Sequence, residues 1–111
     1  MRIEFDNPKH EGLVNDHVAL SKKFDRRGKK VSVDILATLN VLRDAPSLAE
    51  VPRAFRPHPL KAEWKGFFAA DVDDKGRVIF KPKHAGDPNY RIDNHRTITS
   101  ITVVEIYKDY H

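Results

Sequence analysis

Apolar and polar residues alternate at the start of the chain. Ile3 and Phe5 are apolar and have charged residues on either side. A period of two is typical of a strand with one buried face. Asn7 and Pro8 end this pattern, because Asn favours a helix N-cap and Pro is tolerated at the first helical position. The chain is therefore predicted to begin with a short strand that leads into a helix.

Two helical periods follow. The first apolar face has spacings of 4, 3 and 4, at Leu13, His17, Leu20 and Phe24; the second has spacings of 4, 4 and 3, at Val31, Ile35, Leu39 and Leu42. These faces predict one helix over residues 8–27, ended by Gly28, and another over residues 30–44, ended by Pro46. On this face His17 is expected to be packed or half-buried rather than catalytic.

Strand patterns dominate the second half of the chain. Residues 67–72 and 78–80 are two β-like runs separated by the turn residues 73–76, which predicts a hairpin. The preceding residues 45–60 contain four prolines and predict a stiff, irregular connection. Residues 98–107 alternate and then become strongly apolar, which predicts a further strand. Two helices packed on a sheet give an α+β fold.

Length and composition agree with this architecture. A chain of 111 residues suits one domain with one core, so we expect a single domain over residues 1–111. No apolar run approaches the ~18 residues of a transmembrane helix, and the N-terminus has no signal-peptide pattern. We therefore expect a cytoplasmic protein without membrane contact. The absence of cysteine excludes disulfides and thiolate zinc sites.

The excess of positive charge is concentrated in one third of the sequence. Residues 53–83 contain eight Lys or Arg against four acids, a net charge of +4, and the other residues balance. A basic segment on a neutral body favours a polyanionic partner, nucleic acid first. The alternative is a solvated charged face.

The histidines do not have metal-ligand spacing. None of the six lies three or four residues from another, so we expect no metal site and no cofactor. The sequence also lacks a Gly-x-Ser-x-Gly elbow, a Walker loop and a dinucleotide fingerprint, which leaves hydrolase-elbow, NTPase and Rossmann functions without support.

Metal-free RNA cleavage needs a base for the ribose 2′-hydroxyl, cations for the transition state and an acid for the leaving 5′-oxygen. Histidine suits either proton role because its unperturbed pKa is about 6.5. Lys and Arg stabilise the negative charge. His58, Lys61, Arg77 and His111 supply this set, although other small basic proteins contain similar residues.

Three motifs occur in order: His58-Pro59-Leu60-Lys61 to Lys65-Gly66, then Arg77-Val78-Ile79-Phe80, then Asp109-Tyr110-His111. They resemble the H-x-L-K-G-x-x-K-G, W-R-x-x-F and D-Y-H segments of the HigB branch of the RelE/ParE toxin superfamily. The resemblance covers essentially the whole chain. It implies a RelE-like fold, with a two-helix hairpin packed on a curved antiparallel sheet in the order β-α-α-β-β-β.

The resemblance also implies a function. HigB-like toxins of type II toxin–antitoxin systems, which act in plasmid maintenance, are endoribonucleases that cut messenger RNA in the ribosomal A site. A helix-turn-helix antitoxin binds and silences them, and links the toxin indirectly to operator DNA. We therefore expect the ribosome, messenger RNA and such an antitoxin as partners.

Roles can be carried over by position. The resemblance implies acid/base roles for His58 and His111, and phosphate binding for Lys61 and Arg77. Asp109 would orient a partner or a base. Tyr110 would position or stack on RNA. The remaining expected RNA contacts are Arg56, Trp64, Lys65 and Lys81.

The sequence departs from the family pattern at several places. Ala62 stands where the family has a glycine, and Gly76 where a bulky aromatic residue precedes the arginine. Residues 83–100 form a longer connection than is usual. This connection would cover the active face, contact the antitoxin or form a self-association surface.

Alternatives remain open at this point. Trp64 could be a packing residue, and Arg77 could simply pair with Asp71 or Asp73. On the same fold, the chain could be a module that inhibits a protein target such as DNA gyrase, or a degenerate toxin that regulates its own operon. A non-catalytic RNA-binding domain is a third reading.

Overall fold

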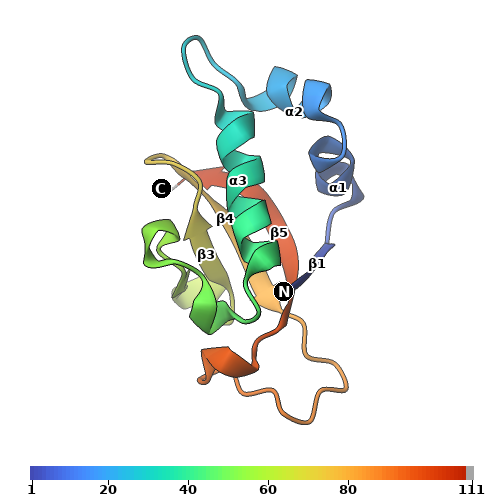
Figure 1. The fold of residues 1–111 in the computed structure, drawn as a ribbon, viewed down its shortest axis with the longest axis vertical. Helices are drawn as coiled ribbons and strands as arrows, with labels where there is room; N and C mark the ends of the chain where they lie inside the picture. Colours follow the sequence, from blue (N-terminus) through green and yellow to red (C-terminus); the bar gives the residue numbers. More distant parts are fainter. Residues whose placement is uncertain (110–111) are drawn as a thin grey trace.

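The computed structural model describes residues 1–109, so Tyr110 and His111 of the predicted site lie outside the described residues (Figure 1). The main elements are β1 (Arg2–Phe5), α1 (Pro8–Val14), α2 (His17–Phe24), α3 (Val31–Asp44), β2 (His58–Pro59), β3 (Phe68–Asp71), β4 (Gly76–Pro82) and β5 (Ser100–Asp109). Short 3-10 helices lie in the connections: η1 (Leu48–Glu50), η2 (Arg53–Phe55), η3 (Ala62–Trp64) and η4 (His95–Thr97).

The strands form one sheet in the order β1-β5-β4-β3-β2. The pairs β2–β3, β3–β4 and β4–β5 are antiparallel, whereas β1 pairs with β5 in parallel. The predicted α+β architecture is confirmed. The sheet is mixed rather than purely antiparallel, because its first strand in sequence, β1, runs parallel to its last, β5. The hairpin over residues 67–80, the long final strand and the helix predicted over residues 30–44 are all present.

The helix predicted over residues 8–27 is instead two helices. Asn15 ends α1, and Asp16 adopts an extended backbone and caps α2, its side chain accepting a hydrogen bond from the Ala19 N–H at 3.2 Å. Asn and Asp compete with helical hydrogen bonds in a helix interior and favour caps. His17 therefore begins α2 and is exposed, so the expectation that it would be packed was wrong.

The core lies between the helices and one face of the sheet. In Figure 1, α3 crosses this face. From α3 and the hairpin, this core buries Val31, Ile35, Leu39, Leu42, Phe68, Ala70, Val78 and Phe80. Burying one large aliphatic or aromatic side chain contributes about 2 kcal/mol. Within residues 1–109, the longest helices fall short of the length and apolar character that crossing a bilayer requires.

The turn between β3 and β4 is held by one buried carboxylate. Asp73 accepts hydrogen bonds from the Lys75 and Gly76 N–H groups, both at 2.9 Å, and from the Tyr107 hydroxyl at 2.9 Å. The Lys29 ammonium, in the turn between α2 and α3, lies 3.1 Å from the same carboxylate. Asp73 therefore joins three segments that are distant in sequence.

The electrostatics of this cluster follow from burial and hydrogen bonding. Burial raises the pKa of Asp73, but the donors around it, Lys29 and Tyr107 included, together hold that pKa below its ordinary value of 3.8. Burial and the neighbouring carboxylate raise the pKa of the Tyr107 hydroxyl. The folded protein thus favours an ionised Asp73 beside a neutral Tyr107.

The same tyrosine occupies the space beside Gly76. A Cβ atom at position 76 would lie 2.2 Å from Cε1 of the Tyr107 ring. Tyr107 also packs edge-on against Phe24, with ring centroids 5.7 Å apart. The ring on β5 therefore fills the place where the family pattern has an aromatic side chain on β4. An aromatic ring laid over a glycine of the neighbouring strand compensates for the missing side chain.

Gly76→Ala is expected to lower the free energy of unfolding by about 2 to 3 kcal/mol, because the new methyl group displaces the Tyr107 ring. Urea unfolding measures this change. Gly12→Ala is the control, since a Cβ there meets nothing within 4 Å inside α1 and should stabilise slightly. In a Tyr107→Ala background the cost of Gly76→Ala should largely disappear; strictly additive costs would contradict the packing argument.

Asp73 should also make the free energy of unfolding depend on pH in the acid range. A carboxyl whose pKa is lowered on folding stabilises the protein above its unfolded pKa, and this stability is lost as pH falls through the folded pKa. Relative to Asp73→Asn, the wild type should lose stability as pH falls below about 4. Unfolding experiments between pH 2 and 7 test this. Asp74→Asn removes a carboxylate whose side chain is 78% exposed, and an equal effect there would contradict the assignment.

Candidate active site

The face of the sheet opposite the helices carries the predicted site residues. Phe68 and Ala70 of β3 belong to the core, so the alternating Ala69 faces the other way. Directly opposite residues of antiparallel strands share a face, and His58, Ala69, Ile79 and Glu105 form one such row across four strands. We refer to this surface as the outer face.

His58 sits at the end of that row in a defined chemical state. Its ring Nδ1 lies 2.6 Å from the backbone oxygen of Arg56. A carbonyl oxygen can only accept, so this contact requires a proton on Nδ1 and leaves Nε2 as the ring nitrogen that faces away from the Arg56 carbonyl. Arg56 has a left-handed backbone, with φ 46°, which L-residues seldom adopt. Prolines on both sides of His58 further restrain the ring.

Arg77 lies on the next row of the outer face. Its cross-strand neighbours are Asp71 on β3 and Lys108 on β5. From strand geometry, its Cα lies two strands from His58, about 10 Å across the sheet and about 7 Å along it. Asp109, the last described residue, pairs with Gly76 beside this row. Of the two acids considered as simple partners, Asp71 faces Arg77, whereas Asp73 is engaged by Tyr107 and Lys29.

A loop over residues 60–67 borders the outer face and carries more of the predicted set. It is closed by the Leu60 N–H donating to the Phe67 carbonyl at 2.8 Å, and η3 lies at its centre. A hollow of about 480 Å³ is lined by Glu63, Trp64, Phe67 and Lys108. Because Lys108 is on β5, the loop and the end of the chain's last strand border the same hollow.

Trp64 and Ala62 have structural roles in this loop. The Trp64 ring packs edge-on against Phe67, with centroids 5.2 Å apart, and is half-buried while it lines the hollow. Ala62 has φ 57°, in the left-handed region. This conformation explains why the family pattern has glycine there, and keeping alanine costs about 1 kcal/mol of backbone strain.

The other predicted RNA contacts surround this loop. Lys61 and Lys65 are exposed at its two sides. The Lys81 ammonium lies 5.9 Å from the centroid of the Phe67 ring. The Arg56 side chain is 69% exposed, and its Nε lies 3.7 Å from the Asp71 carboxylate. Four cations thus border the outer face, with an aromatic pair among them.

Sequence reasoning missed Glu105 on this face. It is half-buried and directly faces Ile79, in the same row as His58. The signal was a single acid inside the strongly apolar run of residues 101–106. Strand pairing was needed to show that this acid shares a face with His58 rather than with the core.

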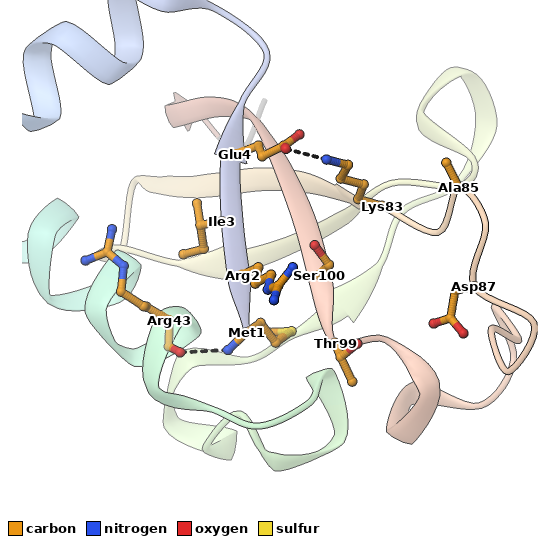
Figure 2. Close-up of a pocket in the computed structure, with 10 residues that line it drawn as sticks. All are labelled: Met1, Arg2, Ile3, Glu4, Arg43, Lys83, Ala85, Asp87, Thr99 and Ser100. Carbon is orange, nitrogen blue, oxygen red and sulfur yellow. Dashed lines mark hydrogen bonds and ion pairs between the residues drawn. The ribbon is translucent and has the colours of Figure 1, made fainter.

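Residues 83–99 lie at the other end of the sheet. They connect the end of β4 to the start of β5, whereas Arg77 and Asp109 are at the opposite ends of these strands. Figure 2 shows that part of this segment lines a hollow together with β1. The hollow has a volume of about 1010 Å³. In it Lys83 pairs with Glu4, and the Met1 amine donates to the Arg43 carbonyl at 2.6 Å. The long connection therefore does not lie beside Arg77.

No grouping of three or more His, Cys, Asp or Glu side chains suited to a metal ion occurs within residues 1–109. The outer face instead offers a histidine, several cations and the carboxylates of Asp71 and Glu105. Such a set can bind a phosphate backbone and transfer protons.

Comparisons with known proteins bear on the fold. No protein-family model matches the sequence, and no curated protein sequence matches it significantly. Solved structures do match. The YoeB–YefM complex from Staphylococcus aureus gives a TM-score of 0.54 at 17% identity, over 100% of this chain and 97% of that chain. The YoeB/ParE toxin from Agrobacterium tumefaciens gives 0.53 at 13% identity, over 100% of both chains.

A mutant of YafQ from E. coli is also similar, with a TM-score of 0.50 at 22% identity, over 99% of this chain and 94% of that chain. At these identities the likeness concerns the fold. The predicted RelE-like architecture is confirmed: the chain has the α+β fold of the YoeB toxins along its whole length.

Proposed function

We propose that this chain is the toxin of a type II toxin–antitoxin system, related to the HigB branch, and that it cleaves messenger RNA in the ribosomal A site without a metal ion. It would act in the cytoplasm. The fold supports this proposal, because the similar chains include two described as YoeB toxins or their complex. The observation that carries it is the hydrogen bond from His58 Nδ1 to the Arg56 carbonyl.

That hydrogen bond prepares His58 for proton transfer. With Nδ1 protonated, Nε2 can take the proton of a ribose 2′-hydroxyl. The 2′-oxygen then attacks the adjacent phosphorus, and the P–O5′ bond breaks. We assign protonation of the leaving 5′-oxygen to His111. The products are a 2′,3′-cyclic phosphate and a 5′-hydroxyl, and no other reactant is needed.

Cations on the outer face complete the proposal. Arg77 and Lys61 would stabilise the negative charge that develops on the phosphorane-like transition state. Asp109 would orient a partner or a base, and Tyr110 would stack on RNA. Contacts away from the scissile phosphate would come from Arg56, Trp64, Lys65 and Lys81, and these hold the strand rather than assist the chemistry.

A protein partner is part of the proposal. One structure with the same fold is of a YoeB–YefM complex, so a toxin of this architecture binds a second protein. We propose a helix-turn-helix antitoxin that silences this chain and brings it indirectly to operator DNA. Residues 83–99 would form part of the contact surface for this antitoxin.

His58→Ala and His111→Ala are each expected to reduce cleavage by about 10² to 10⁴-fold, because each removes one proton-transfer group. Inducible expression in a bacterium, followed by mapping of messenger RNA 5′ ends, measures this. The wild type should arrest growth and cut inside translated codons. His17→Ala is the matched control, since it removes an exposed histidine at the start of α2.

Other outcomes of this expression experiment would favour a different function. Growth arrest without cuts would favour a protein target such as DNA gyrase. No arrest at good expression would indicate a degenerate toxin kept for binding. Cleavage by His58→Ala at the wild-type rate would show that the hydrogen bond to Arg56 does not prepare the base.

Arg77→Ala should lower the cleavage rate by about 10² to 10³-fold, as loss of a group that stabilises transition-state charge does. Lys65→Ala should cost less than about tenfold, because an exposed contact to the RNA backbone contributes little to the chemistry. Single-turnover cleavage by equal amounts of folded protein compares the two. An equal or reversed ranking would remove the phosphate role from Arg77.

A further inference from the structure

A second basic surface lies away from the outer face. Residues 22–30, which we call the basic turn, contain six cations against one anion and so carry +5 over nine residues. In Figure 1 this turn between α2 and α3 projects beyond the sheet. The charge exceeds that of the segment 53–83, although that segment is more than three times as long.

The basic turn is held in one conformation. The Arg26 N–H donates to the Lys29 carbonyl at 3.0 Å, and the Lys29 N–H donates to the Arg26 carbonyl at 2.9 Å. Gly28, with φ 76°, supplies the left-handed residue that so tight a turn requires. A solvated run of charges would not need this closure, whereas a binding surface loses less entropy when it is already ordered.

Two further contacts fix the turn to the rest of the molecule. The Asp25 carboxylate accepts from the Ser21 hydroxyl at 2.6 Å and from the Ser32 N–H at 2.8 Å, so the single acid joins the end of α2 to the start of α3. The Lys29 ammonium lies 3.1 Å from Asp73 and so docks the turn on the β3–β4 hairpin.

Five cations then remain available. Within residues 1–109, no carboxylate lies within ion-pair distance of the following side chains, all of them exposed: Lys22, Lys23, Arg26, Arg27 and Lys30. The N-terminus of α3, which begins at Val31, adds the positive end of a 14-residue helix dipole. The electrostatic potential here is therefore strongly positive.

The chemistry of the turn favours phosphate over a protein partner. Its one apolar side chain, Phe24, is half-buried and packs against Tyr107. Protein interfaces usually have an apolar centre, whereas contacts to nucleic-acid backbones are made by polar groups, Lys and Arg prominent among them, and need no apolar centre. On the side of the hairpin, Asp73 and Asp74 contact only Lys29 of this turn, so neither acid pairs with the other five cations.

We infer that the basic turn binds the phosphate backbone of folded RNA and forms a second RNA contact separate from the outer face. This inference goes beyond the proposed cleavage, because a chain that bound RNA without cutting it would use the same surface. Contacts to phosphates position a protein on RNA without reading its sequence.

Binding to a fluorescent 2′-O-methyl RNA hairpin tests this, since that RNA lacks the 2′-hydroxyl and stays uncut. A variant of the basic turn, which we call the arm variant, removes four charges: Lys22→Gln, Lys23→Gln, Arg26→Gln and Arg27→Gln. The control variant removes four exposed charges elsewhere: Lys9→Gln, Arg43→Gln, Arg91→Gln and Arg96→Gln. Urea unfolding of both variants establishes that each is folded before binding is compared.

The arm variant should bind at least about tenfold more weakly near 0.1 M salt, and its slope of log affinity against log salt should fall by about 3. The control should change much less. Equal losses in both variants would mean that only net charge matters, and no loss in the arm variant would remove the turn from binding; either result overturns the inference. So would displacement of the RNA by polyglutamate at equal charge, which would indicate an acidic protein partner.

A result against the basic turn leaves the proposed nuclease intact, because cleavage depends on His58 and Arg77 and is read by cut ends. Conversely, loss of cleavage in His58→Ala should leave hairpin binding within about twofold of wild type, since His58 lies on β2 and not in the basic turn, and the substitution leaves every Lys and Arg in place.

Discussion

One buried carboxylate holds the chemically important end of this molecule together. Asp73 receives two N–H groups of its own turn, the hydroxyl of Tyr107 and the ammonium of Lys29. A buried charge costs free energy unless donors surround it, so loss of any one of these hydrogen bonds would destabilise the whole cluster. The start of β4, the end of β5 and the turn after α2 are therefore fixed to one another. Arg77 directly follows Gly76, whose N–H donates to Asp73, so this cluster also fixes the backbone position of Arg77.

Tyr107 couples that electrostatic cluster to packing. Its hydroxyl binds Asp73, while its ring lies over Gly76 and against Phe24. In the family pattern an aromatic side chain occupies position 76, and here the neighbouring strand supplies the ring instead. The departure therefore moves an aromatic group from β4 to β5 and preserves the packed volume. Ala62 differs, because no neighbouring group replaces the family's glycine: alanine itself adopts the left-handed backbone conformation, which is strained for a residue with a Cβ atom.

The division of the sheet into two faces separates stability from chemistry. The helices bury the face that holds Phe68, Ala70, Val78 and Phe80, whereas the opposite face carries His58, Glu105 and most of the predicted cations. Substitutions on the outer face can thus alter binding without opening the core. The long connection after β4 lies at the opposite end of the sheet from Arg77 and Asp109.

Local patterns in the sequence were sufficient for most of the fold. Alternation predicted the first and last strands, and the turn residues 73–76, which contain Asp and Gly, predicted the hairpin, because both signals depend on neighbouring residues. The break at Asn15 and Asp16 was missed, since an apolar stripe of helical spacing continued across it. A cap competes with helix continuation by a small free-energy difference that periodicity does not report.

The candidate site divides in the same way. Sequence alone determined its residue types, and the resemblance assigned roles to His58, Arg77 and the terminal motif. Three features depend on tertiary structure: the hydrogen bond from His58 Nδ1 to the Arg56 carbonyl, the row of the sheet that His58 shares with Glu105, and the ion pair between Lys29 and Asp73. His58 and Glu105 are 47 positions apart and lie on different strands, and only the folded register of the strands between them brings them to one face.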